Sequence, residues 1–87
     1  MARTSAPPQS PRSLAVPPDL AEKWAENLYY YRKRAGYETQ ADLAEALGCT
    51  RAAVSSWEQG KRAPSPIHQR AIAKLLGLTA GFLFPAS

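Results

Sequence analysis

The side chains best suited to contact a ligand lie in a short stretch, residues 51–62. In a helix over 51–59, Arg51, Ser55 and Ser56 share an outer face with the small side chain of Ala52. A guanidinium can donate two hydrogen bonds to one guanine edge, a serine hydroxyl can donate or accept, and an alanine can touch a thymine methyl. This combination predicts DNA base reading by Arg51, Ala52, Ser55 and Ser56. Alternatively, Arg51 only holds a phosphate and the serines are only solvated.

Polar and basic side chains around this stretch are suited to hold DNA phosphates. Gln40 and Thr50 stand at the starts of two expected helices, where free backbone N–H groups attract anions. Gln59 ends the second of these helices and Lys61 and Arg62 follow it, so all three would lie beside the sugar–phosphate backbone. We expect phosphate contacts at all five positions, although capping alone would explain Thr50. Such contacts position a protein on DNA and carry no sequence information.

Two short helices joined by a turn must position these side chains. Leu43, Leu47, Val54 and Trp57 recur at helical spacing and point to one shared core, and the small Ala44 suits a close helix crossing. A turn at Gly48 separates the two helices. This pattern is typical of a helix-turn-helix, which places its second helix in the DNA major groove.

The remaining sequence predicts three further helices. The first is expected to begin with Asp19 as N-cap and to end before Gly36, with an apolar stripe of Leu20, Trp24, Leu28, Tyr31 and Ala35. Thr39 and Asp42 form a capping-box start for the first helix of the helix-turn-helix, and the second further helix is expected to start at Ser65 followed by Pro66. That later helix carries Ile67, Ala71, Ile72, Leu75 and Leu76 and ends at Gly77, and a last short helix follows Thr79.

No segment alternates with the period of a strand, so the fold class is expected to be all-α. We predict a compact five-helix bundle with a helix-turn-helix over residues 19–87. Residues 1–18 hold Pro7, Pro8, Pro11, Pro17 and Pro18 among polar residues, a composition that predicts a disordered N-terminal arm.

Composition narrows the function classes. The 87-residue chain has a formal net charge of +4 and a pI near 9.6, which favours a polyanionic partner. Its single cysteine, Cys49, excludes an internal disulfide, and no apolar run could span a membrane. His68, Cys49 and the serines show no catalytic spacing, so we expect no enzyme activity, no cofactor and no metal site. A reducing cytoplasm is the simplest compartment.

The motif residues resemble the lambdoid phage repressor and Cro family, also called the xenobiotic response element family. The resemblance runs from about Leu20 to Phe84 and is most specific from Thr39 to Lys61. It implies a five-helix DNA-binding domain, commonly a transcriptional repressor. It also implies that Ser56 reads bases, and that Arg32 and Glu58 pair to tie the first helix to the end of the recognition helix.

These observations predict a sequence-specific regulator that binds double-stranded DNA, of the small phage Cro type or a prophage or plasmid repressor. We expect this regulator to act in the bacterial cytoplasm or nucleoid, or in a phage-infected host. A palindromic operator and a homodimer, formed in solution or only on DNA, would fit, with Ala80 and Phe82 as the seam. Two alternatives stay open: an autoregulating antitoxin of a toxin–antitoxin pair, and a protein-interaction module with the same fold.

Overall fold

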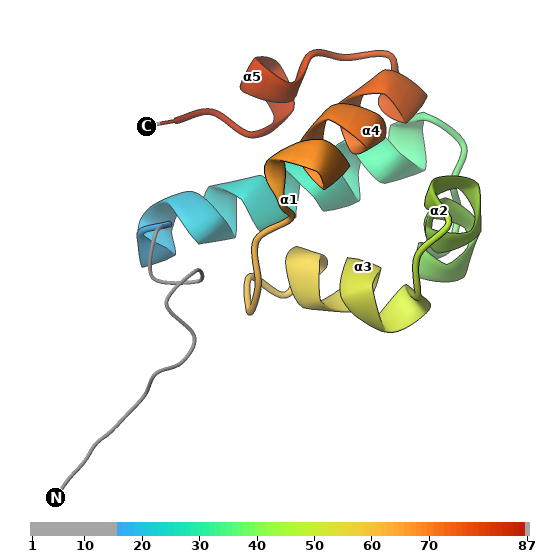
Figure 1. Cartoon of the computed structure of the whole chain (residues 1–87), viewed down its shortest axis with the longest axis horizontal. Coiled ribbons are helices and arrows are strands. Elements are labelled where there is room, and N and C mark those ends of the chain that lie inside the picture. Colours follow the sequence, from blue (N-terminus) through green and yellow to red (C-terminus); the bar gives the residue numbers. More distant parts are fainter. Residues whose placement is uncertain (1–15, 87) are drawn as a thin grey trace, which may run out of the picture.

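The computed structural model describes residues 16–86, which form five α-helices and no strand (Figure 1). The helices are α1 (Pro18–Arg34), α2 (Gln40–Leu47), α3 (Arg51–Glu58), α4 (Pro66–Leu76) and α5 (Ala80–Leu83). In Figure 1, α3 lies below α1, while α4 and α5 lie above it. The all-α class and the five-helix order predicted from the sequence are confirmed.

The start of α1 differs from the expectation. Pro17 occupies the N-cap position without a side-chain hydrogen bond, and Pro18 is the first helical residue, so Asp19 is not the cap. A proline fits the first helical position because its fixed φ suits the helix and its missing N–H would have no helical partner there. Val16 already packs, half-buried, against the core. Residues 16–18 therefore belong to the folded unit, and the rest of the predicted arm lies outside the described residues.

Local capping defines α2 and α3 as the sequence predicts. The Thr39 hydroxyl accepts a hydrogen bond from the Asp42 N–H at 3.0 Å, and the Asp42 carboxylate accepts one from the Thr39 N–H at 3.2 Å. The Thr50 hydroxyl accepts from the Ala53 N–H at 3.1 Å. Between the helices, Gly48 adopts a φ of 77°, a left-handed conformation that favours glycine. These contacts fix the helix-turn-helix within residues 39–58.

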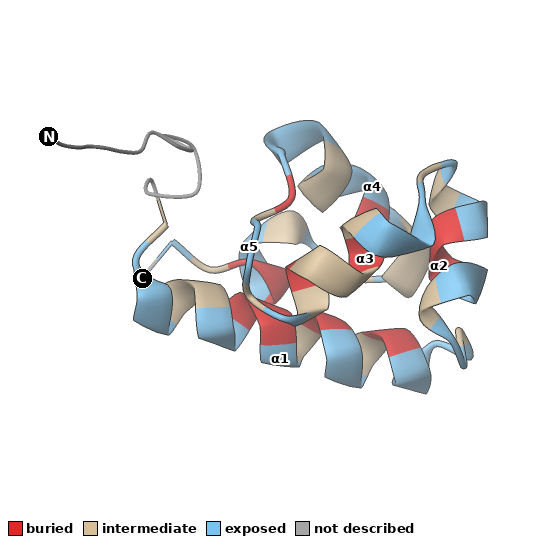
Figure 2. Cartoon of the chain, turned by 90° about the horizontal axis from the view of Figure 1, so that it is seen from below, coloured by how far each residue is buried: buried red, intermediate tan, exposed pale blue. Residues whose placement is uncertain are grey.

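One fully buried side chain from each helix builds the centre of the core. The five, in chain order, are Leu28, Leu43, Val54, Ile72 and Leu83. The buried residues of α1 accordingly lie on the side of that helix that faces the other helices (Figure 2). On α4 the buried residues are Ile72 and Ala73, whereas Ile67 is 71% exposed and Ala71 is exposed as well.

The C-terminal segment is tied back to α1 by polar and aromatic contacts. The Trp24 indole N–H donates to the Pro85 carbonyl at 2.7 Å, and the Asn27 amide donates to the Leu83 carbonyl at 2.9 Å. The rings of Trp24 and Phe84 lie edge to face with centroids 5.4 Å apart. These contacts hold α5 against α1 although it has only four residues.

Candidate nucleic-acid interface

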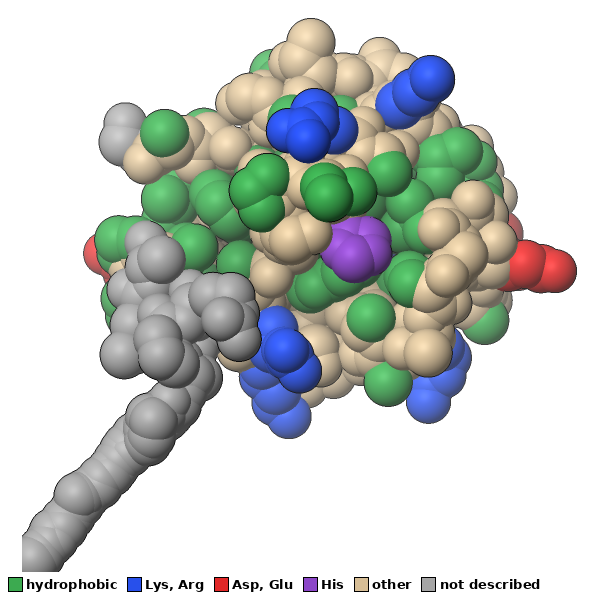
Figure 3. All heavy atoms as spheres, in the orientation of Figure 1, with side chains coloured by type: hydrophobic (Ala, Val, Ile, Leu, Met, Phe, Trp, Pro, Cys, Tyr) green, Lys and Arg blue, Asp and Glu red, His purple; other side chains and the backbone are tan. Residues whose placement is uncertain are grey.

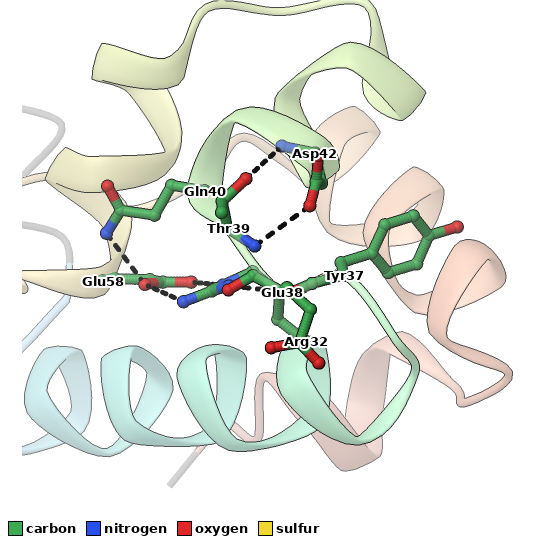
Figure 4. Close-up of polar contacts among 7 residues, drawn as sticks. All are labelled: Arg32, Tyr37, Glu38, Thr39, Gln40, Asp42 and Glu58. Atoms are coloured by element: carbon green, nitrogen blue, oxygen red, sulfur yellow. Dashed lines mark hydrogen bonds and ion pairs between the residues drawn. The ribbon is translucent and has the colours of Figure 1, made fainter.

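A buried ion pair fixes the end of α3 against α1 (Figure 4). The Arg32 Nε donates to Glu58 Oε2 at 2.6 Å, and Nη2 donates to Glu58 Oε1 at 3.3 Å. Both side chains are only 4% exposed. The remaining guanidinium nitrogen, Nη1, donates to the Tyr37 and Glu38 carbonyls at 2.7 and 2.9 Å. Arg32 thus joins α1, the loop before α2, and α3, and the predicted pair is present in the structure.

Gln40 belongs to the same network. Its Nε2 donates to Glu58 Oε1 at 3.0 Å, so part of the amide that we expected on a phosphate is engaged within the protein (Figure 4). The second amide hydrogen and the backbone N–H groups at the start of α2 can still meet an anion. Gln40 therefore links the start of α2 to the end of α3. Its phosphate contact stays a prediction.

The predicted base-reading residues occupy the outer part of α3. Arg51 and Ala52 are exposed, and Ser55 and Ser56 are half-buried, whereas Val54 and Trp57 point into the core. The Ser55 hydroxyl accepts a hydrogen bond from Gln59 Nε2 at 2.6 Å, so this pair is partly satisfied within the helix. The groups of α3 that remain available to contact DNA are therefore the guanidinium of Arg51, the methyl group of Ala52 and the hydroxyl of Ser56.

A hollow of about 760 Å³ adjoins this face of α3, between it, the loop 59–65 and the start of α4. Three of the five residues predicted to contact phosphates line the hollow, namely Thr50, Lys61 and Arg62. The other two, Gln40 and Gln59, do not line it. The full lining is Thr50, Ala52, Ala53, Ser56, Trp57, Lys61, Arg62, Ala63, Ser65 and His68. Hydroxyl, cationic and apolar groups together match the sugars and phosphates of a nucleic-acid strand.

Sequence reasoning did not assign Ser65 and His68 to this surface. The Ser65 Oγ lies 3.0 Å from His68 Nδ1, and the His68 ring packs on Trp57 with centroids 5.2 Å apart. Figure 3 shows the histidine at the centre of this face, among hydrophobic side chains and with basic side chains towards the edges. The position of Ser65 as an N-cap was readable from the sequence. The packing of His68 on Trp57, 11 positions earlier, could not be predicted from the sequence.

The charges of this surface suit a polyanion. Arg51, Lys61 and Arg62 are exposed, whereas the nearby Glu58 carboxylate is buried and neutralised by Arg32. A carboxylate held in this way repels phosphates less than a free one would. The exposed charges of this surface are therefore cationic, while the Glu58 carboxylate is engaged by Arg32 inside the protein.

Cys49, in the turn between α2 and α3, is a partly buried free thiol packed against the core. Burial raises the pKa of this thiol, and a backbone hydrogen bond opposes the rise. A thiol with a raised pKa is a poor nucleophile.

Within residues 16–86, no three His, Cys, Asp or Glu side chains gather where a metal ion could bind. No helix in that part of the chain is long and apolar enough to cross a membrane.

Comparisons with known proteins place this geometry in context. A family model described as helix-turn-helix matches residues 28–83. No curated protein matches the chain. A solved structure of hydroxypropylphosphonic acid epoxidase from S. wedmorenis matches with a TM-score of 0.66 and 32% identity, over 75% of this chain and 34% of that one.

Two further solved structures give the same likeness. Iron(II) HppE in complex with substrate matches with a TM-score of 0.66 and 32% identity, over 75% of this chain and 37% of that one. Cobalt(II) HppE in complex with Tris buffer matches with a TM-score of 0.67 and 31% identity, over 76% and 37%. The chain thus spans about a third of the length of these proteins.

Proposed function

Because the chain belongs to the helix-turn-helix family of the phage repressor and Cro type, and is thereby a DNA-binding regulator, we propose that it is a sequence-specific repressor. In this proposal α3 enters the major groove of a double-stranded operator, and the bound protein occludes a promoter. The chain itself binds and does not catalyse. Its place of action is the bacterial cytoplasm or nucleoid, or a phage-infected host.

The observation that carries the proposal is the arrangement of α3. The buried Arg32–Glu58 pair fixes one end of the helix, and Arg51 and Ala52 are exposed at the other end. Lys61 and Arg62 follow within the adjoining hollow. A rigid helix with an exposed arginine, flanked by cations, combines a base-reading group with phosphate-binding groups.

The operator is proposed to be a palindrome bound by two copies. One recognition helix buries a small interface, and two copies related by a two-fold axis would reach major grooves about 34 Å apart. Selection of bound sites from a random DNA pool tests this directly. A recovered palindrome supports both the operator and its symmetry, whereas recovery of no sequence preference contradicts specific binding.

Substitution of Arg51 tests the reading of bases. Arg51→Ala should weaken operator binding by about 1–3 kcal/mol and relax the preference at one position per half-site, because the guanidinium is proposed to contact one base pair. Arg70→Ala is the matched control, since Arg70 is an exposed arginine of α4 that does not line the hollow. If Arg51→Ala keeps the full preference profile, Arg51 contacts only the backbone.

The likeness to about a third of an epoxidase favours a second candidate function. In that reading the domain is a protein-interaction module attached to, or recruited by, another domain. Binding to DNA that weakens steeply with salt would argue against this reading, because phosphate contacts release counterions. An antitoxin role is a further variant of the repressor, and co-purification with a toxin encoded beside it would identify that variant.

A further inference from the structure

The only histidine of the chain, His68, lies half-buried in the first turn of α4. Its ring packs on the Trp57 ring of α3, with centroids 5.2 Å apart and an angle of 51° between the planes. Both residues line the hollow beside α3, and Figure 3 shows the histidine at the centre of this face. An imidazole is the side chain whose charge ordinarily changes between about pH 5 and 8. The surface proposed to face DNA therefore contains one group that can link binding to pH.

A serine hydroxyl holds one nitrogen of this ring. Ser65 Oγ lies 3.0 Å from His68 Nδ1, and it accepts a hydrogen bond from the His68 backbone N–H at 3.3 Å. A hydroxyl can donate to Nδ1 of a neutral ring and accept from Nδ1 of a charged ring, so the contact suits both states. With Nδ1 held in this way, Nε2 carries a hydrogen in both states. Within residues 16–86, Nε2 has no hydrogen-bond partner, so it is available to an acceptor outside the protein.

The charged side chains around the ring are cationic. Lys61 and Arg62, from the loop between α3 and α4, line the same hollow. Among residues 16–86, no carboxylate lines it, and neither α1, α3 nor the rest of α4 adds a charged side chain to it. The indole of Trp57 is an aromatic ring of the kind that attracts cations. A phosphate placed among these groups brings negative charge to the imidazole and favours its charged form.

We propose that His68 binds a DNA phosphate through Nε2, and that its imidazole takes up a proton as the complex forms. The inference rests on the proposed function, since it places a phosphate of the bound strand in the hollow beside α3. The proton comes from the solvent, and the resulting imidazolium donates to Ser65 Oγ through Nδ1 and to a phosphate oxygen through Nε2. Because a proton binds together with the DNA, the affinity should rise as the pH falls.

The expected linkage has a defined limit. One imidazole takes up at most about one proton per bound copy, so the logarithm of the association constant should fall by at most about one for each pH unit near neutrality. Contacts made by lysine and arginine alone would change with salt and not with pH in this range, because these side chains stay charged there. Dependence on pH therefore distinguishes a contact by His68 from the other phosphate contacts.

Calorimetric titration of the full chain at low salt, with a mixed-sequence DNA duplex of about 20 base pairs, tests the proposal. Repeating the titration in buffers that differ in ionisation enthalpy counts the protons taken up. The wild type should take up a measurable fraction of a proton per copy near neutral pH. His68→Phe keeps an aromatic ring against Trp57 and removes both nitrogens. This variant should take up no proton and bind about tenfold more weakly at about pH 6, because it lacks the charge-assisted hydrogen bond.

A conservative variant separates the hydrogen bond from the charge. His68→Gln keeps an amide donor near the position of Nε2 but cannot take up a proton in this range. At about pH 8, where an ordinary imidazole is neutral, it should regain most of the affinity lost in His68→Phe. It should not show the gain in affinity at lower pH. This difference between the two variants would not arise if His68 only packed on Trp57.

Two controls make the result specific. Arg70→Ala changes an exposed cation of α4 outside the hollow and should leave proton uptake unchanged. Circular dichroism should show that both His68 variants are folded. A wild type that does not bind the duplex even at low salt contradicts the proposed function itself. A wild type that binds without proton uptake, or a His68→Phe variant with the uptake and affinity of the wild type, overturns only the role of His68.

Discussion

Removal of one partner of the Arg32–Glu58 pair should destabilise this domain severely. Glu58→Ala leaves a guanidinium that is 4% exposed without its carboxylate, and it also removes the acceptor of Gln40 Nε2. Breaking a buried ion pair in this way costs about 3–5 kcal/mol. Arg32 keeps two carbonyl acceptors, at 2.7 and 2.9 Å, so we expect about 3 kcal/mol, at the lower end.

Arg32→Ala should cost more than Glu58→Ala. It leaves a buried carboxylate with Gln40 as its remaining donor, and it removes the donor to the half-buried Tyr37 carbonyl, which adds about 1 kcal/mol. A domain of this size has a total stability of roughly 4–10 kcal/mol, so a wild type at the low end of this range would keep little folded protein at room temperature after Arg32→Ala. The free energy of unfolding is measured by urea denaturation with circular dichroism.

The double variant Arg32→Ala/Glu58→Ala, compared with these two single variants, distinguishes a buried ion pair from a surface ion pair. It removes both charges together, so it should be more stable than the sum of the single variants predicts, with a coupling energy of about 2 kcal/mol or more. Glu45→Ala, an exposed change on α2, should stay within about 0.5 kcal/mol of the wild type. Single-variant costs below about 1 kcal/mol that add in the double variant would refute the reasoning, because exposed pairs behave in that way.

Three further predictions concern the core, the DNA backbone and the turn. Trp57→Ala should lower the free energy of unfolding by about 3–5 kcal/mol, because Trp57 is 8% exposed in the core; a stably folded variant that has lost DNA binding would contradict this. Lys61→Ala should weaken specific and non-specific DNA equally and reduce the salt slope of binding by about one, and a sequence-selective loss would exclude a phosphate contact. Cys49 should react slowly with a disulfide reagent until the protein unfolds, because the raised thiol pKa leaves little thiolate. Since the folded thiol holds its proton more tightly, its contribution to stability is lost as the pH rises through the thiol pKa, and Cys49→Ala should reduce that alkaline loss.

Helices whose ends are set by neighbouring residues could be predicted from the sequence alone. The Thr39–Asp42 box, the Thr50 cap and the Gly48 turn act over three or four positions, so their chemistry is visible in the order of residues. The inward positions of Val54 and Trp57 follow from helical spacing in the same way. The start of α1 was missed because two prolines begin that helix through backbone geometry, without the side-chain cap that was sought.

Contacts between side chains that are distant in sequence could not be predicted in this way, because they depend on how the helices pack. Resemblance implied the pairing of Arg32 with Glu58, but the burial of the pair, its two carbonyl acceptors and its link to Gln40 depend on three segments packing together. The packing of His68 on Trp57 and of Tyr31 on Phe82 likewise joins different helices. Periodicity reports which side of a helix is apolar, but not which neighbour covers it, because the crossing of helices is set by the packing of the whole core.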